Sequence, residues 1–481
     1  MPCPARLEGV GMNSRMIGFL GGCAMFAATL VLPAPAGMTG QAWIVAGLVA
    51  LMACWWMTEA LPLTATALMP FLVLPFAGIM KASDTAASYY SPTLFLILGG
   101  AFLALAIERT GLHRRLALAL LEGLGSSGGA PRLLFAFMMA TAIVSMAISN
   151  TSTALIMMPM AIAVIEAGGI PEDQRRGLSG ALPMGIAFAA SIGGLGTIVG
   201  SPTNAIAVGL LDSMIHVRIS FAQWAMMGVP MVVLSIPLAA WIVARTQSVA
   251  QDPFDIGAAR QAIHVPTRWS EPERRLMPLV ALAFILWITT PLLEPLLPKG
   301  SLTDGTIAVA VGLLLFILPD GTGRPLLNWD EANRAPWDVI MMFGGGLALA
   351  EGMGESGLAD WLGHSLLPLA SVPLPLVALA ITAMVILITE FASNVATASG
   401  ILPVVASLTV ALGADPLLLA MPAAIAASWG FMLPSGTGPN AIAWATGRIE
   451  MRSMLKAGLW LDIAGAPLIV AVIWVMARVT G

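Results

Sequence analysis

Apolar residues fill most of the chain in long runs, and short polar stretches separate these runs. A helix needs about 20 apolar residues to cross the hydrocarbon core of a bilayer. The pattern therefore predicts an all-α polytopic membrane protein. We expect eleven membrane-spanning segments, at residues 16–33, 41–57, 61–80, 93–112, 178–211, 220–244, 276–297, 303–319, 337–354, 417–446 and 457–477.

Two further apolar runs, 132–166 and 372–411, are too long for one crossing and are each broken by a polar cluster. The clusters are SNTST at 149–153 and SNVAT at 393–397. Small polar side chains are costly in hydrocarbon, and irregular backbone at that depth is tolerated only where it lines a cavity inside the protein. We therefore expect two re-entrant helical hairpins, each entering and leaving on the same side of the membrane.

Basic residues support this topology. With a cytoplasmic N-terminus, the expected cytoplasmic segments carry 18 of the 22 lysines and arginines, and the outer segments carry four. This is the bias that cytoplasmic loops show. Counting either hairpin as a single crossing would invert it. We therefore expect a multi-pass protein of the inner (plasma) membrane, with the C-terminus outside. The first hairpin is expected to open to the cytoplasm and the second to the outside.

Composition narrows the class further. The 481 residues are 58% hydrophobic and 10% charged, with mean hydropathy +0.89 and net charge −4. No basic block suggests nucleic acid, and lipid is the expected surrounding. Neither a disulfide framework nor a metal site is indicated by the three cysteines, Cys3, Cys23 and Cys54. The first run could be a cleaved signal peptide, but its length favours a retained span.

The chain also contains an internal repeat. Residues 99–112 match 345–358, residues 145–159 match 389–403, and residues 200–206 match 436–442, in the same order. Since the hairpins are expected to enter from opposite sides, the repeat is expected to be inverted, as in many secondary transporters. The predicted parts are an N-terminal scaffold (1–92), a first core (93–215), scaffold helices with a cytoplasmic linker (216–336), a second core (337–446) and a C-terminal helix (447–481).

Glycine and proline interrupt the fifth and tenth spans at 193–204 and 433–440. Freed carbonyls and hydroxyls suit a small hard cation, and the N-termini of half-helices suit an anion. No lysine or arginine lies near these motifs in the sequence. We therefore expect bound cations and helix dipoles to neutralise a carboxylate substrate. Glu390, beside the second cluster, either tunes ion binding or bonds the hairpin backbone.

The chain resembles the divalent anion/sodium symporters, the family of bacterial dicarboxylate carriers and animal citrate and sulfate carriers. The resemblance rests on WWMTEALP at 55–62, SNT at 149–151, TEFASNVAT at 389–397 and 432–442, and it covers nearly the whole chain. It implies a homodimer in which a transport domain moves against a scaffold domain, an elevator mechanism.

The resemblance also implies site residues. About two sodium sites are expected, one formed by Ser145, Ser149, Asn150 and the Gly200 carbonyl, the other by Thr389, Ala392, Asn394 and the Gly436 carbonyl. The substrate contacts are expected at Asn150, Thr151, Ser201, Pro202, Asn394, Val395 and Thr437. Two positions depart from the family pattern: Val395 lacks a common hydroxyl, and Gly438 replaces a common proline. Both bear on which anion is carried.

The leading hypothesis is a sodium-coupled importer of C4-dicarboxylates such as succinate, malate or fumarate. The nearest alternative is a carrier of citrate, sulfate or another anion with the same fold, or a dicarboxylate exchanger. An ion channel is a different class, and it needs no paired broken helices around a midplane site. We do not expect an enzyme, because no serine–lysine pair, aspartate pair or HExxH motif occurs at membrane depth.

Overall fold

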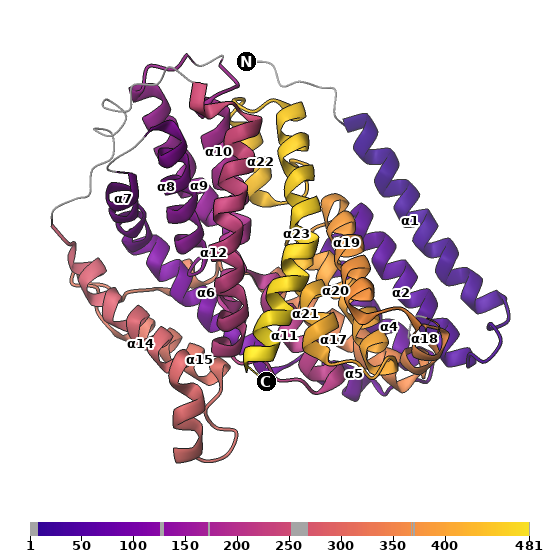
Figure 1. Cartoon of the computed structure of the whole chain (residues 1–481). Coiled ribbons are helices and arrows are strands. Elements are labelled where there is room, and N and C mark those ends of the chain that lie inside the picture. The colour runs from indigo at the N-terminus through magenta and orange to yellow at the C-terminus, as the bar shows by residue number, and fades with distance from the viewer. Residues whose placement is uncertain are drawn as a thin grey trace. The chain divides into compact units, whose positions relative to one another are not determined.

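The computed structural model describes residues 8–125, 129–171, 174–251, 268–366, 368 and 371–480. Most of the predicted cytoplasmic linker, together with Cys3 and His264, lies outside these ranges. Within them the regular structure is helical, apart from one isolated bridge between Pro319 and Pro325 (Figure 1). The all-α prediction is therefore confirmed.

The chain divides into two compact units. The first unit comprises Met1–Leu94, Ile206–Arg218 and Trp337–Ala427, and the second comprises Phe95–Ala205, Ile219–Pro336 and Ser428–Gly481. Helices of the first unit are α1 (Glu8–Val31), α2 (Gly40–Thr58), α3 (Leu63–Thr66), α4 (Met69–Phe76), α5 (Ala82–Ser88), α17 (Trp337–Glu355), α18 (Leu358–Leu366), α19 (Leu374–Phe391), α20 (Asn394–Ala411) and α21 (Pro416–Ala426).

The second unit holds the remaining helices. They are α6 (Pro92–Thr110), α7 (Leu112–Gly125), α8 (Ala130–Ser145), α9 (Asn150–Ala167), α10 (Leu178–Gly194), the start of α11 (Pro202–Ile215), α12 (Phe221–Thr246), α14 (Glu271–Leu293), α15 (Asp304–Ile317), α16 (Trp329–Ala332), α22 (Gly438–Ala445) and α23 (Met451–Thr480).

Nine of the described helices are long and apolar enough to cross a membrane. The expected count of eleven spans is not reproduced as continuous helices. The runs 61–80, 178–211 and 417–446 are each divided into shorter pieces. Proline and glycine explain these divisions, because proline lacks the amide hydrogen that a helix interior needs and glycine weakens it.

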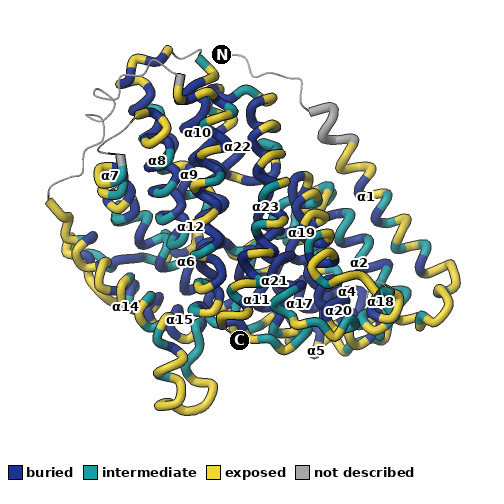
Figure 2. The backbone as a smooth tube through the Cα atoms, viewed as in Figure 1, coloured by how far each residue is buried: buried dark blue, intermediate teal, exposed yellow. Residues whose placement is uncertain are grey.

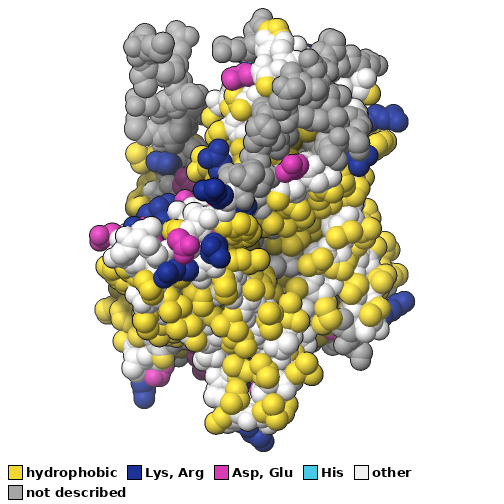
Figure 3. All heavy atoms as spheres, turned by 90° about the vertical axis from the view of Figure 1, so that its left-hand side faces the viewer, with side chains coloured by type: hydrophobic (Ala, Val, Ile, Leu, Met, Phe, Trp, Pro, Cys, Tyr) yellow, Lys and Arg dark blue, Asp and Glu magenta, His cyan; other side chains and the backbone are white. Residues whose placement is uncertain are grey.

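The helices differ in how far they are buried. Every residue of α10 is buried, so this helix forms the interior of the second unit (Figure 2). The outward side of α14, in contrast, exposes large apolar side chains, among them Ile285, Ile288 and Leu292. Figure 3 shows a broad hydrophobic surface on the side where α14 lies. An apolar outer surface over a filled interior is what a helix bundle in lipid requires.

Equivalent turns mark the two copies of the repeat. Gly111 ends α6 with a φ of +80°, and Gly357 ends α17 with a φ of +78°. Glycine adopts this left-handed backbone without the penalty that other residues meet. Each turn is followed by a short helix, α7 or α18, and then by the predicted hairpin.

Candidate functional site

The first hairpin tip lies between α8 and α9. The hydroxyl oxygen of Ser145, the last residue of α8, lies 2.7 Å from the Ala190 carbonyl oxygen and 2.9 Å from Oδ1 of Asn150. Ser149 caps α9, and its hydroxyl accepts the backbone N–H of Ser152 at 3.2 Å. The Ser-Asn cluster is therefore the N-terminus of a helix, held against the carbonyl groups of α10.

The broken fifth span completes this tip. After α10 the chain forms one 3₁₀ turn, Ile198–Gly200, before α11 begins. The side-chain amide of Asn204 donates to the carbonyls of Gly194, at 2.7 Å, and Thr197, at 2.8 Å. These bonds satisfy carbonyls that the helix break leaves without intrahelical partners. The sequence pattern alone assigned no role to Asn204.

Two glycines are required for this close approach. A Cβ added at Gly194 would lie 2.1 Å from Oδ1 of Asn150. A Cβ at Gly200 would lie 2.7 Å from the Gly194 carbonyl oxygen and 2.9 Å from that of Ser145. Neither contact is sterically possible, so the glycines allow the hairpin tip to reach the broken helix.

Oxygen atoms gather around the Asn150 amide. The oxygens of Gly200, Ser145 and Ala190 lie 3.2, 2.9 and 3.1 Å from one amide position. An amide nitrogen at that position donates to them. The three oxygens are acceptors of the kind that a small hard cation also takes as ligands. The Ala190 carbonyl was not foreseen, because a backbone carbonyl carries no sequence signature.

The second hairpin tip repeats the first within the first unit. The hydroxyl of Thr389 lies 2.8 Å from the Ala427 carbonyl oxygen and 3.1 Å from Oδ1 of Asn394. Ser393 caps α20, and its hydroxyl accepts the N–H of Ala396 at 3.2 Å. Both tips therefore share one arrangement: a hydroxyl, an asparagine and the carbonyl of a helix end.

The broken tenth span also repeats the fifth. Thr437 caps α22 and accepts the N–H of Asn440 at 3.2 Å. The side-chain amide of Asn440 donates to the carbonyls of Leu433, at 3.0 Å, and Gly430, at 3.4 Å. The carbonyls that receive these bonds are equivalent, within the repeat, to those bonded by Asn204. Asn440, like Asn204, is fully buried.

Gly438, which departs from the family pattern, contacts the first hairpin. A Cβ added there would lie 2.5 Å from the hydroxyl oxygen of Thr151. The start of α22 therefore packs closely on the start of α9. Thr151 and Thr437, both predicted to contact substrate, are thereby brought to neighbouring helix starts in the second unit.

A cavity of about 220 Å³ lies beside the first tip in the second unit. It is lined by Ser149 and Ser152 of α9 and by Ser201 and Pro202 at the start of α11. Asn150 and Thr151 are not among its lining residues. The N-termini of two helices thus meet one hollow, an arrangement that favours an anion.

The same cavity is lined by Glu108 and Arg334. The expectation that no lysine or arginine lies near the motifs is therefore wrong, because Arg334 lies at this cavity. Arg334 lies 3.1 Å from Glu108 in an ion pair, and Ser152 donates to Glu108 at 3.4 Å. Sequence proximity could not reveal this, because 226 positions separate the paired residues.

The remaining predicted residues do not line this cavity. Ala392, between α19 and α20, is buried in extended backbone, and Glu390 is buried in α19. Val395 packs against an apolar cluster of the first unit that includes Trp55 and Trp56. Gly436 belongs to the second unit.

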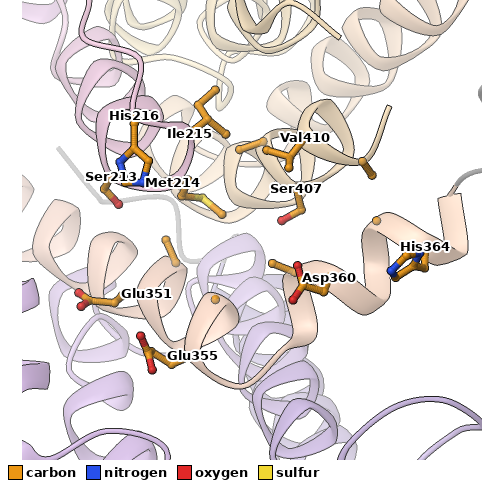
Figure 4. Close-up of a pocket in the computed structure, with 16 residues that line it drawn as sticks. Ser213, Met214, Ile215, His216, Glu351, Glu355, Asp360, His364, Ser407 and Val410 are labelled. Atoms are coloured by element: carbon orange, nitrogen blue, oxygen red, sulfur yellow. The ribbon is translucent and has the colours of Figure 1, made fainter. Parts of the chain in front are cut away.

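Another cavity, about 640 Å³, lies in the first unit, and none of the predicted site residues lines it. Figure 4 shows the carboxylates of Glu351, Glu355 and Asp360 around it, with His216 and His364. Three acidic side chains around one hollow disfavour a dianionic substrate there.

A family model described as the sodium:sulfate symporter transmembrane region matches residues 13–479. The chain belongs to this family. The resemblance to the divalent anion/sodium symporters is thus confirmed, and the chain is placed among multi-pass membrane transporters. Its relatives are transporters rather than enzymes.

Named relatives agree with this placement. The chain is 37% identical over 474 residues to the sodium-dependent dicarboxylate transporter SdcS of Staphylococcus saprophyticus, covering 96% of this chain and 91% of that protein. It is also 37% identical over 482 residues to SdcS of Staphylococcus aureus, covering 97% and 92%. The YdaH transporter of Alcanivorax borkumensis has a similar fold, with a TM-score of 0.57, 15% identity and 98% coverage of both chains.

Proposed function

We propose that this chain is a sodium-coupled importer of C4-dicarboxylates such as succinate, malate and fumarate. The relatives that cover nearly the whole chain carry the name sodium-dependent dicarboxylate transporter. The oxygens of Ser145, Ala190 and Gly200, which converge at the first hairpin tip, are the observation that carries the sodium part of the proposal. Sodium is a hard cation, and hard cations take oxygen ligands.

The first sodium ion binds between Ser145, Asn150 and the carbonyls of Ala190 and Gly200, with Ser149 holding the helix start. Its support is the convergence of the oxygens of Ser145, Ala190 and Gly200 within 2.9 to 3.2 Å of one amide position of Asn150. The buried position matters, because Ser145 is fully buried and an uncompensated cation could not remain there without these ligands.

The second sodium ion binds at Thr389, Asn394 and the Ala427 carbonyl, with Ala392 and the Gly436 carbonyl as further ligands. Its support is the repetition of the same contacts, 2.8 and 3.1 Å from the Thr389 hydroxyl. About two sodium ions are therefore coupled to each substrate.

The dicarboxylate binds at helix N-termini that the ions make more electropositive. The proposed substrate contacts are Asn150, Thr151, Ser201, Pro202, Asn394, Val395 and Thr437. Cation binding precedes anion binding, because a carboxylate transferred to a buried site needs compensating charge.

The carrier works as a homodimer with an elevator motion, and its N-terminus is cytoplasmic. The support for the orientation is the bias of basic residues toward the expected cytoplasmic segments. The inverted relation of the two hairpins follows from the same bias, and it lets one site face either side of the membrane in turn.

The test is uptake of labelled succinate into proteoliposomes with and without an inward sodium gradient. We expect saturable uptake that requires sodium and is inhibited more by malate and fumarate than by citrate or sulfate. Inhibition chiefly by sulfate or citrate would replace the substrate. Uptake that needs internal dicarboxylate instead of sodium would identify an exchanger, and non-saturable flux would indicate a channel.

A further inference from the structure

An ion pair lies at the cavity beside the first hairpin tip, next to two of the residues that we propose as substrate contacts. Arg334 and Glu108 line the hollow together with Ser152 and Ser201. Glu108 accepts from Arg334 at 3.1 Å and from the Ser152 hydroxyl at 3.4 Å. A carboxylate of the protein itself thus occupies the guanidinium and the serine that a substrate carboxylate would use.

Arg109, the residue after Glu108, fixes the segment that precedes Arg334 to the end of α6. Arg109 donates to the carbonyls of Pro325, at 3.1 Å, and Leu326, at 2.7 Å, and it pairs with the fully buried Asp320. This anchor explains why Arg334 stands beside Glu108.

Arg109 and Arg334 differ in exposure. The less exposed Arg109 anchors the segment, whereas the more exposed Arg334 can exchange its partner. The Arg109 side chain is 18% exposed and has several partners, whereas the Arg334 side chain is 64% exposed and Glu108 is 30% exposed. An exposed ion pair contributes little net stability. Its guanidinium can therefore turn to another carboxylate, and arginine binds carboxylates in a bidentate geometry that lysine does not match.

We propose that Arg334 is a specificity-determining residue that releases Glu108 and binds a carboxylate of the passing anion at this cavity. Glu108 acts as a built-in competitor: it holds Arg334 when no substrate is present, and only an anion that binds Arg334 more tightly than Glu108 does can displace it. This inference rests on the proposed transport of dicarboxylates. Arg334 then supplies the positive charge that selects a dianion over a monoanion.

Substitutions of Arg334 and of Glu108 should change the KM for succinate in opposite directions. Arg334→Gln removes the receiving charge, so we expect the KM for succinate to rise about three- to tenfold. Glu108→Gln removes the competitor and leaves the arginine, so the KM should fall about two- to fivefold. Arg334→Lys keeps the charge but loses the bidentate geometry, and its KM should lie between those of wild type and Arg334→Gln.

A matched control is available in the same unit. Arg176 pairs with Glu450 at 3.2 Å, with side chains 74% and 35% exposed, and neither residue lines the cavity. Arg176→Gln and Glu450→Gln should leave the KM for succinate unchanged. They test whether loss of any exposed ion pair alters transport.

The experiment is succinate uptake into proteoliposomes containing the full chain, with KM and the maximal rate measured separately at two ionic strengths. KM changes of opposite sign, larger at low salt, support the proposal. KM changes of the same sign in both variants, or none beyond the controls, would overturn it and make the pair a structural clamp. Failure of the wild-type protein to take up succinate would instead refute the proposed function.

Discussion

At both hairpin tips a hydroxyl side chain joins an asparagine to the carbonyl of a helix end. Ser145 does this in the second unit, and Thr389 does it in the first unit. The N-cap serines and the distances agree closely between the two tips. Their surroundings do not agree. The first tip borders a cavity with a charged pair, whereas Val395 at the second tip packs on an apolar, tryptophan-containing cluster.

This contrast separates two tasks. The repeated hydrogen bonds suit the cation binding that we propose at both tips. The unequal surroundings suit a substrate whose two ends meet different environments. We expect changes to the shared bonds to affect sodium, and changes to the unshared neighbours to affect the choice of anion.

The largest effect is expected from removing either asparagine. Asn150→Ala and Asn394→Ala should each lower sodium-driven succinate uptake by more than about a hundredfold, because each removes a proposed direct ligand. Even supporting groups around metal ligands change affinity about 10- to 100-fold. Uptake is measured after confirming that each variant purifies as a single species. Asn328→Ala, which removes only the cap of α16, is the control and should retain uptake. Uptake like wild type in both site variants would disprove the assignment.

A smaller but still large effect is expected from Gly194→Ala. The new methyl group would meet Oδ1 of Asn150, and overpacking of this kind costs about 1–3 kcal/mol. We expect the sodium concentration for half-maximal uptake to rise about tenfold or more. Gly123→Ala in α7 is the matched control, since a Cβ there meets nothing within 4 Å. Equal responses of the two variants would argue against a close contact at Asn150.

Val395→Thr should change the anion preference and leave the sodium dependence nearly unchanged. A new hydrogen bond to a substrate carboxylate would raise the affinity for that anion about ten- to a hundredfold. A hydroxyl without a hydrogen-bond partner beside the apolar cluster would lower it instead. Competition by succinate, malate, fumarate, citrate and sulfate is measured beside a sodium titration. Val404→Thr, on the same helix and cluster, is the control. A shifted sodium curve with an unchanged anion ranking would place Val395 at the cation site.

The smallest functional effect is expected from cysteines placed at the far ends of the hairpins. Gly169→Cys should react with an impermeant reagent from the cytoplasm and Gly413→Cys from outside, in a cysteine-free background. Both glycines are exposed, have positive φ and leave open space for a side chain, so strain should be similar at both sites. Labelling of both positions from one side would refute the inverted repeat.

Much of this arrangement could be predicted from sequence, because glycine, proline and serine–asparagine clusters inside long apolar runs are strong signals that a helix breaks or begins there. The hairpin tips, the breaks in the fifth and tenth spans and the repeat could be located in this way. The place of the Ala190 carbonyl at the first tip could not be found, since any residue supplies a carbonyl. Arg334 was missed because its partner, Glu108, lies on a distant helix and neither residue belongs to a motif.

The sodium dependence of succinate uptake tests most directly whether the two tips bind cations in the same way. It is measured for the wild-type protein, Ser145→Ala and Thr389→Ala, each of which loses one hydroxyl that bridges a tip. We predict a sigmoidal sodium curve for the wild type. In both variants the curve should shift to higher sodium while the ranking of anions is preserved. A hyperbolic wild-type curve, or sodium curves that neither substitution moves, would contradict the account.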